Sequence, residues 1–411
     1  MIHIKYFSPL LLIGTLLFSG CKSNVADDPG VTVKDKYLVS YTLVRSMPVS
    51  DVSSLYSPIQ SVYPDVADII PSVKCGEKIY AVTYNTTFGS KNLIASGLVC
   101  IPDGGGTYPI LSFQNGTNTI KADAPSLNPT SYITQLISGF ATTGFVVVMP
   151  DYLGFGASAS IFHPYLHKES TVNPILDLFR AVKEMSAKTE LKLKLSSDLY
   201  LMGYSQGGLS TLQLHRAIES GYSSEFNLKG VGCGAGPYNL SLITEMIGTA
   251  TTYSQPYYIA YIVKGFESAG AFSNPYSDIF NEPYASRIDG LFNGTNSGTV
   301  INSQLSTNMS QLFTNDFRTT MNTGSKFKAM KDALAASSVS AWKIKTPLIL
   351  AHGQADTDVA PVVSKQLYDD LMTLDPTLPV TYLPMAGMDH GTASAPAIIN
   401  FVKRFLLIKG K

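Results

Sequence analysis

One stretch, residues 198–218, restricts the folds open to this chain of 411 residues more than any other. It begins as a short apolar run of strand type, Asp198–Tyr204, and continues with apolar residues at helical spacing. Between the two lies the motif Gly-x-Ser-x-Gly, Gly203–Gly207. Where a strand turns sharply into a helix, glycines allow the two elements to approach, and the residue at the turn is lifted above the sheet edge. The stretch therefore predicts a strand–turn–helix unit that presents the Ser205 hydroxyl, with the backbone N–H of Gln206 facing the same space.

Strand and helix patterns alternate from residue 108 to residue 235 and return after residue 342. A chain with 33 glycines can contain Gly-x-Ser-x-Gly by chance, and the strand and helix patterns on either side of the motif argue against such an accident. It predicts an α/β fold with a mostly parallel central sheet flanked by helices. A hairpin is expected at residues 77–101, and one helix is expected to begin at Asn173-Pro174, with the proline in its first turn. Residues 37–72 mix strand and helix signals and receive no assignment.

The alternation stops between these two parts of the chain. Residues 239–341 are rich in Ser, Thr, Asn and Tyr and carry helix-length patterns. Ligands of open α/β sheets bind beyond the carboxyl ends of the strands, and an insertion between two strands naturally covers that end. We therefore expect an α/β core made of residues 37–238 and 342–411, with residues 239–341 as a helical cap or lid. The alternative is a second small domain without a role in substrate binding.

The charge balance excludes one class of partner. Lys+Arg and Asp+Glu number 30 each, so neither a nucleic acid nor an anionic membrane surface is an expected partner. Charged residues make up 15% of the chain, compared with about 25% in soluble domains. Ser, Thr, Asn and Tyr must supply the polar surface instead, a composition that favours an exported protein.

The N-terminus has the pattern of a targeting segment, because a basic residue precedes an apolar run that ends in small residues and Cys21. The run is too short to span a bilayer, and residues 1–20 are predicted to be a signal peptide. Leu17–Cys21 resembles a bacterial lipobox, although Phe18 stands where leucine is usual. This resemblance predicts lipidation of Cys21, with residues 21–36 as a tether that anchors a lipoprotein to a membrane of the bacterial cell envelope. The alternative is an ordinary secretory signal and a secreted protein.

Beside Cys21, three cysteines remain after the predicted signal. If the hairpin turns at Thr87 and Phe88, Cys75 and Cys100 lie close together, and a disulfide between them is geometrically compatible and suits an exported protein. Two buried thiols are the alternative. Cys233, in an apolar run, is expected to be a small core residue.

A serine hydroxyl becomes a good nucleophile only when a base stands within hydrogen-bond reach and an acid orients that base. Asp356 lies in the loop after a buried strand that ends at Ala351, and His390 lies in the loop after a strand that ends at Leu383. The order Ser, Asp, His is the one expected after a strand–turn–helix of this type. All three loops would open at the carboxyl edge of the sheet. Ser205, Asp356 and His390 are therefore predicted to form a catalytic triad.

Other residues compete for two of these roles. Asp358 is the alternative acid, disfavoured because Asp356 occupies the pattern Gly-x-x-Asp-x-x-Val. His352 is expected to brace the acid loop, and His215 to face solvent or a neighbouring strand. The remaining competitors, His163 and His167, lie in a loop that could border the pocket.

An oxyanion hole needs a second backbone N–H beside that of Gln206. The polar loop after the strand at 108–113 is expected to supply it, with Thr117 as the donor and Asn118 or Gly116 as alternatives. The sequence has neither a Cys-x-x-Cys pair nor a phosphate-binding glycine loop after a strand. Neither a metal nor a cofactor is expected.

From about residue 75 to its end the chain resembles the α/β-hydrolase superfamily, and within it the secretory lipase family typified by fungal lipase A-type enzymes and their bacterial relatives. The resemblance rests on these motifs: Ser112–Thr117, Pro150–Gly156, Gly203–Gly208, Gly236–Tyr238, His352–Asp356 and Asp389–Thr392. It implies carboxylester hydrolysis by Ser205, Asp356 and His390, and it implies that the insertion corresponds in place to the lid of that family. Asn115 departs from the family pattern, because bacterial relatives often have histidine before Gly-Thr.

The expected function is therefore hydrolysis of a small-molecule or lipid ester through an acyl-enzyme intermediate. A serine peptidase of the same fold is one alternative, since it would use the same triad. A carbohydrate esterase that removes acetyl or feruloyl groups from polysaccharide is another, and a non-catalytic surface lipoprotein that binds a ligand is the third. The sequence assigns no acyl length, alcohol partner or oligomeric state.

Overall fold

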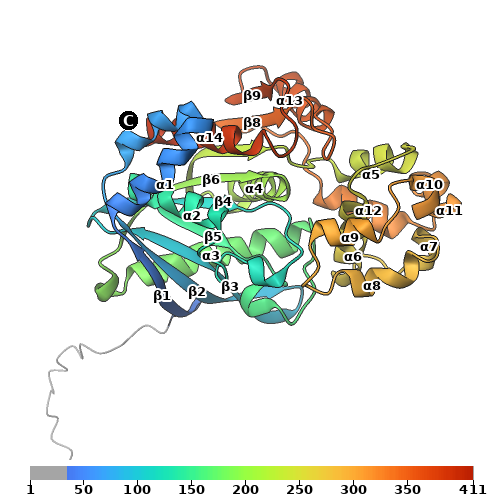
Figure 1. Cartoon of the computed structure of the whole chain (residues 1–411), viewed down its shortest axis with the longest axis horizontal. Coiled ribbons are helices and arrows are strands. Elements are labelled where there is room, and N and C mark those ends of the chain that lie inside the picture. The colour runs from blue at the N-terminus through green and yellow to red at the C-terminus, as the bar shows by residue number, and fades with distance from the viewer. Residues whose placement is uncertain (1–34, 411) are drawn as a thin grey trace, which may run out of the picture. The chain divides into compact units, whose positions relative to one another are not determined.

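A mixed sheet of nine strands forms the centre of the protein in a computed structural model that describes residues 35–410 (Figure 1). Its strand order is β1-β2-β3-β5-β4-β6-β7-β8-β9. Antiparallel pairing joins β1, β2, β3 and β5, and every pair from β5 to β9 is parallel. The strands are β1 (Leu38–Met47), β2 (Glu77–Phe88), β3 (Lys91–Pro102), β4 (Thr107–Gln114), β5 (Val146–Pro150), β6 (Lys194–Tyr204), β7 (Asn227–Gly234), β8 (Leu348–Gly353) and β9 (Val380–Met385). The expected α/β fold with a mostly parallel sheet is confirmed.

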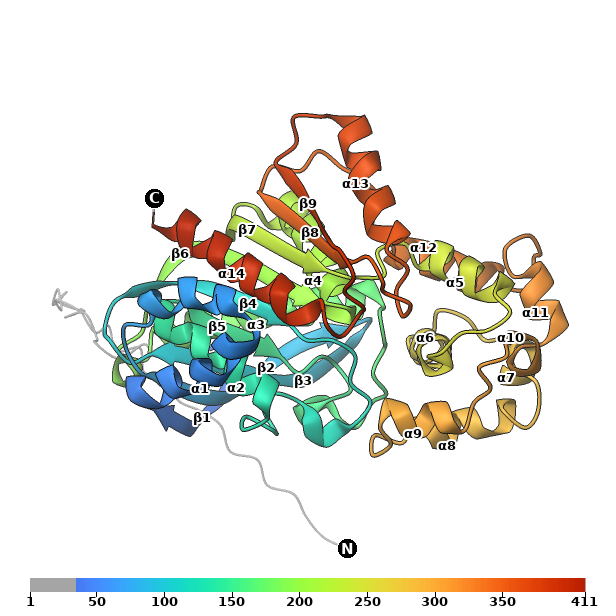
Figure 2. The ribbon, with the colours of Figure 1, turned by 45° about the horizontal axis from the view of Figure 1, so that its top comes forward.

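Helices cover both faces of the sheet (Figures 1 and 2). On one face lie α3 (Lys168–Ser186), α4 (Gln206–Ala217) and α13 (Val362–Leu374), whose apolar side chains share one core with residues of the insertion. On the other face lie α1 (Val49–Val62), α2 (Tyr132–Ser138) and α14 (Ser394–Lys409), which share a second core. We call the face covered by α3, α4 and α13 the cap face, and the face covered by α1, α2 and α14 the α14 face.

The first strand and helix occupy much of the region that the sequence left unassigned. β1 is an edge strand that pairs with β2, and its register shifts between Leu38 and Ser40 and again between Leu43 and Arg45. Such irregularities disrupt the alternation of buried and exposed residues by which a half-buried strand is recognised. The predicted signal peptide, Cys21 and residues 22–34 of the tether lie outside the described residues.

The start of α3 differs from its prediction. The helix begins at Lys168, and Pro174 lies inside it rather than in its first turn. His167 caps the helix, because its ring Nδ1 accepts a hydrogen bond from the backbone N–H of Ser170 at 3.4 Å. Proline inside a helix removes one backbone hydrogen bond, and burial of the apolar face of α3 offsets that loss.

The hairpin of β2 and β3 is present, but its turn lies at Gly89 and Ser90 rather than at Thr87 and Phe88. Gly89 adopts a φ of 56°, which glycine allows without strain. The later turn shifts the register, so that Cys100 lies opposite Ile79. Cys75 lies instead beside Gly104, where an added Cβ would stand 3.1 Å from the cysteine Cβ.

The suggested Cys75–Cys100 disulfide is therefore wrong for this structure, in which both thiols are free. Cys100 is fully buried, and the Cys75 thiol lies 3.8 Å from the backbone oxygen of Thr142. Cys233 is a fully buried core residue, as expected.

The insertion between β7 and β8 consists of short helices joined by loops and forms the group of helices at the right of Figure 1. Its helices are α5 (Leu240–Thr249), α6 (Pro256–Ser268), α7 (Tyr276–Ile279), α8 (Ile288–Leu291), α9 (Gly298–Ser303), α10 (Met309–Leu312), α11 (Asn315–Thr320) and α12 (Lys328–Ser337). Phe280, Phe313, Phe317 and Phe327 pack ring to ring at its centre. Within residues 35–410, no helix is both long and apolar enough to cross a membrane.

Candidate active site

Ser205 lies at the turn between β6 and α4, where its motif predicts it. Its φ of 60° and ψ of −124° are strained for a residue with a side chain. A Cβ on Gly203 would stand 2.3 Å from the carbonyl oxygen of Gly207, and one on Gly207 would stand 1.8 Å from that of Gln114. Only glycine fits at both positions, and the close approach holds Ser205 at the N-terminus of α4.

A continuous series of hydrogen bonds joins Ser205, His390 and Asp356. Ser205 Oγ lies 2.9 Å from His390 Nε2, and His390 Nδ1 lies 2.6 Å from Asp356 Oδ2. A carboxylate accepts hydrogen bonds, so Nδ1 carries the proton and Nε2 is free to accept the proton of the serine hydroxyl. The structure thus brings together the three residues predicted for the triad, from the loops after β6, β8 and β9.

The acid is the most constrained of the three groups. Asp356 Oδ1 accepts the backbone N–H groups of Asp358 and Val359, each at 2.9 Å, and Oδ2 also lies 3.2 Å from His352 Nε2. Burial alone would raise the pKa of Asp356, but hydrogen bonds from His352 and His390 hold it well below its usual value. The carboxylate is therefore ionised at neutral pH, and His352 braces it as expected.

The polar loop after β4 lies directly against the serine. A Cβ added to Gly116 would stand 3.8 Å from the Cβ of Ser205. The neighbouring Thr117 hydroxyl is hydrogen-bonded to the Tyr165 hydroxyl at 2.6 Å, and the Tyr261 hydroxyl donates to the carbonyl oxygen of Asn118 at 3.0 Å. These contacts hold the loop beside Ser205, and the role of the Thr117 N–H as an oxyanion donor stays a prediction.

His163 supports the other expected oxyanion donor, a contact that the sequence did not predict. Its Nδ1 lies 2.7 Å from the carbonyl oxygen of Leu153, and its Nε2 lies 2.9 Å from the side-chain nitrogen of Gln206. Burial lowers the pKa of His163 to about 4, so the ring is neutral at pH 7. Nδ1–H then donates to Leu153, and Nε2 accepts from the Gln206 amide. The Gln206 side chain, 2% exposed, is fixed by this bond.

The two remaining competing histidines serve structural roles. His215 does not face solvent: it is fully buried and packs edge-on against the ring of Trp342, with Nε2 3.1 Å from a carboxylate oxygen of Glu219. The ring contact explains the burial, because Trp342 follows the insertion and returns the chain over the end of α4. His167 caps α3.

The insertion encloses Ser205 from the cap face. A cavity of about 30 Å³ borders Ser205 and Gln206 there. The other residues of its wall are Tyr165, Leu166, Pro237, Tyr253, Tyr258, Ile259, Ile262, Asp358 and Val359. The Tyr253 hydroxyl donates to the carbonyl oxygen of Asp358 at 2.8 Å, so the insertion contacts the acid loop as well as the loop after β4.

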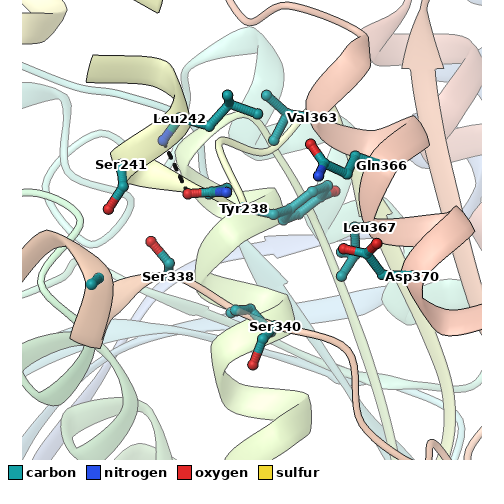
Figure 3. A pocket seen from close by; sticks show the side chains of 12 residues that line it. Tyr238, Ser241, Leu242, Ser338, Ser340, Val363, Gln366, Leu367 and Asp370 are labelled. Carbon is teal, nitrogen blue, oxygen red and sulfur yellow. Dashed lines mark hydrogen bonds between the residues drawn. The ribbon is translucent and has the colours of Figure 1, made fainter. Parts of the chain in front are cut away.

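Another cavity, of about 210 Å³, lies where the chain enters and leaves the insertion (Figure 3). Figure 3 shows Tyr238 and Leu242 on the entering segment, Ser338 and Ser340 on the returning one, and side chains of α13 opposite them. Ser205, Asp356 and His390 are not part of its wall. This cavity therefore lies at the base of the insertion, apart from Ser205, Asp356 and His390.

Comparison with known protein families assigns the chain to one of them. The sequence model of the Secretory lipase family matches residues 122–405, which is well over half of the chain. The chain belongs to the secretory lipase family. The match includes Ser205, Asp356 and His390 and begins just after the loop that carries Thr117. A search of curated protein sequences finds no match.

Solved structures share the fold of this secretory lipase family member. A putative hydrolase from Legionella pneumophila is 23% identical with a TM-score of 0.79, over 91% of this chain and 98% of that one. The rice cell wall degrading esterase LipA from Xanthomonas oryzae is 22% identical with a TM-score of 0.75, over 92% and 98%. Candida antarctica lipase A is 17% identical with a TM-score of 0.62, over 90% and 83%.

Membership of the family identifies the protein as an ester hydrolase. A secretory family also agrees with the exported location expected from the N-terminal sequence.

Proposed function

We propose that the protein is a serine carboxylic ester hydrolase in which Ser205 is the nucleophile, His390 the general base and Asp356 the residue that orients the base. The hydrogen-bonded series from Ser205 through His390 to the buried carboxylate carries the proposal. A serine with a base at 2.9 Å, and a base with an ionised acid at 2.6 Å, meets the geometric requirement for an activated hydroxyl.

The reaction proceeds in two steps. Ser205 Oγ attacks the ester carbonyl while its proton passes to His390 Nε2, and the oxyanion forms beside the backbone N–H groups of Gln206 and Thr117. The C–O bond to the alcohol then breaks, and His390 gives its proton to the leaving oxygen. In the second step His390 removes a proton from water, water attacks the acyl-enzyme, and the carboxylic acid leaves as Ser205 recovers its proton.

The cavity on the cap face favours short acyl chains. Its volume of about 30 Å³ and its wall of tyrosine and isoleucine side chains suit a group of a few carbon atoms. The insertion acts as a lid over this cavity, since Tyr253 and Tyr261 join it to the loops on both sides of Ser205. Short-chain esters are therefore the proposed substrates.

The proposed location is the cell envelope, with the protein held at the membrane by lipid on Cys21. The lipobox-like sequence Leu17–Cys21 supports this proposal, and the secretory family agrees with export. A Cys21→Ala variant is expected to lose membrane association in cell fractionation. If the variant stays with the membrane fraction to the same extent, lipidation at Cys21 is refuted.

Substitution of the nucleophile tests the chemistry. The Ser205→Ala variant is expected to lose hydrolysis of p-nitrophenyl acetate, and labelling by a fluorophosphonate probe, while its circular dichroism spectrum stays that of the parent. Ser220→Ala, at an exposed position after α4, is the control and should keep most of the activity. Aminoacyl amides in the same assay separate esterase from peptidase activity. Full ester hydrolysis by Ser205→Ala would refute the triad.

A further inference from the structure

Asp358, the alternative triad acid of the sequence analysis, lies in the wall of the cavity on the cap face that borders Ser205 (the cap-face cavity). The main chain of Asp358 is fixed on both sides. Its N–H donates to Asp356 Oδ1 at 2.9 Å, and its carbonyl oxygen accepts from the Tyr253 hydroxyl at 2.8 Å. Neither contact uses the side chain, so the triad leaves the Asp358 carboxylate available to a group that enters the cavity.

The Asp358 carboxylate lacks a cationic partner. Among residues 35–410 no Lys, Arg or His forms an ion pair with it, and the wall of the cap-face cavity contains none of these residue types. Burial raises the pKa of Asp358 and outweighs both the nearby His390 and a hydrogen bond from the neutral Gln255 side chain. A partly buried carboxylate without a cation is unfavourable, so its place beside a nucleophile points to a ligand that brings the positive charge.

Three tyrosines stand in the same wall as this carboxylate: Tyr165, Tyr253 and Tyr258. The hydroxyls of Tyr165 and Tyr253 are bonded to the Thr117 hydroxyl and the Asp358 carbonyl oxygen, so these residues offer their rings to a bound group. Burial and the charge of Asp358 both raise the pKa of Tyr258, because the phenol and the carboxylate are neighbours. Aromatic rings attract ammonium groups, and a carboxylate beside them supplies the counter-charge. The wall therefore combines two features by which proteins recognise a small organic cation.

The size and position of the cap-face cavity decide where on an ester the charge stands. The cavity has a volume of about 30 Å³, which suits a group of a few atoms, and it borders the nucleophile Ser205 and the expected oxyanion donor Gln206. A group that lies there during attack by Ser205 is separated from the ester carbonyl carbon by about one carbon atom. The proposed function places the acyl group in this cavity, so the ammonium belongs to the acyl part of the substrate.

We propose that Asp358 and the tyrosines of the cap-face cavity bind an ammonium group next to the ester carbonyl, so that the preferred substrates are esters of small α-amino acids such as glycine and alanine. The inference rests on the proposed function of Ser205 and adds the charge of the acyl group. The reaction is the same two-step hydrolysis through Ser205. Water releases the amino acid from the acyl-enzyme, and the ammonium group takes no part in the bond changes.

The test uses three ethyl esters that differ in one terminal atom of the acyl group: glycine ethyl ester, ethyl glycolate and ethyl propionate. At about pH 7 an α-amino group with a pKa of about 7.7 is mostly protonated, so the esters carry an ammonium, a hydroxyl and a methyl group. Each kcat/KM is divided by the rate constant for hydrolysis of the same ester without enzyme, which removes differences in chemical reactivity. The corrected value for glycine ethyl ester should exceed each of the other two at least about tenfold. A smaller advantage over ethyl propionate would overturn the proposal. A smaller advantage over ethyl glycolate would overturn it as well, because the cavity would then read a hydrogen-bonding group and not a charge.

Asp358→Asn assigns the preference to the carboxylate, since it keeps the shape and the main-chain contacts of the residue. The ratio of kcat/KM for glycine ethyl ester to that for ethyl propionate should fall about tenfold. Both esters are assayed on one preparation, so a loss of folded enzyme cancels in the ratio. Asp51→Asn, at an exposed position of α1, is the matched control and should keep the parent ratio. An unchanged ratio in Asp358→Asn would overturn the inference, including the case in which both rates fall together because the carboxylate acts on His390.

Tyr258→Leu tests the aromatic part of the wall and leaves the acid loop intact. Removal of the ring should lower the same ratio about threefold, because one contact between a cation and an aromatic ring is lost. A parent-like ratio in this variant would overturn the assignment of the ammonium group to this wall.

These outcomes are distinct from failure of the proposed function. If the parent enzyme cleaves no ester and Ser205 is not labelled by a fluorophosphonate, the esterase assignment itself is wrong. If Ser205 is labelled and ethyl propionate is cleaved, but glycine ethyl ester has no advantage, only the ammonium site is wrong.

Discussion

One buried carboxyl group far from the reacting centre should contribute to the pH dependence of stability. Glu77, at the start of β2, is fully buried on the α14 face, and the Ser138 hydroxyl donates to its Oε1 at 3.1 Å. Among the described residues its Oε2 has no hydrogen-bond partner. Burial raises the pKa of Glu77 from 4.5 to about 7, against the opposing influence of Ser138 and Arg45.

The size of the effect follows from the difference between these two pKa values. Above pH 4.5 the unfolded chain releases the proton of Glu77, whereas the folded protein keeps it until about pH 7. At Glu77 the folded state therefore holds more protons in this window, and the contribution of Glu77 to stability falls as the pH rises through it. A difference of about 2.5 units at about 1.4 kcal/mol per unit gives a loss of about 3 kcal/mol by pH 8.

Glu77→Gln removes this titration and keeps the shape of the side chain. Urea denaturation followed by circular dichroism should give the variant a free energy of unfolding about 3 kcal/mol above that of the parent at pH 8, and a value within about 1 kcal/mol of it at pH 4.5. Glu245→Gln, at an exposed position of α5, should leave the pH dependence unchanged. Parallel pH profiles for Glu77→Gln and the parent would refute the reasoning.

Two substitutions near Ser205 have sharper effects on catalysis than on substrate affinity. His163→Phe keeps an aromatic ring but removes the acceptor for the Gln206 side chain, so kcat is expected to fall about tenfold or more while KM stays within about twofold of the parent value. His167→Phe is the control and should lower stability while kcat stays unchanged. An unchanged kcat in His163→Phe would exclude the positioning role of His163. Gly207→Ala should abolish ester hydrolysis, because its Cβ would stand 1.8 Å from a backbone carbonyl oxygen. Gly290→Ala, where an added Cβ meets nothing within 4 Å, should behave like the parent, and full activity in Gly207→Ala would contradict the geometry of the turn.

The signals that were readable from the sequence were local ones. The strand before Ser205, the helix after it and the glycines around it lie within residues 198–218, and each reports a backbone requirement of the turn itself. Asp356 and His390 were identifiable because each follows a short run with the pattern of a strand. The carboxyl ends of parallel strands lie at one edge of a sheet, so positions far apart in the chain could be placed together.

The predictions from sequence were wrong where the structure depended on a shift of a few residues in a turn or on the packing of distant segments. A shift of the hairpin turn from Thr87–Phe88 to Gly89–Ser90 moved Cys75 away from Cys100 and left both thiols free. The sequence did not predict the edge strand β1, because its register shifts disrupt the alternation of buried and exposed residues by which a strand is recognised. Periodicity reports which residues share a face, and it does not report how far one strand slides along another.

The sequence by itself thus determined the class of fold, the serine at its turn and the order of the acid and the base. Only the tertiary structure decided that His163 holds Gln206, that His215 is buried against Trp342, and that a cavity borders Ser205 beneath the insertion. Local backbone preferences depend on residues that are close in the chain, so they can be recognised from a short stretch of sequence. Side-chain contacts between distant segments depend on how whole helices and strands pack, and the shape of a substrate cleft is the sum of those contacts.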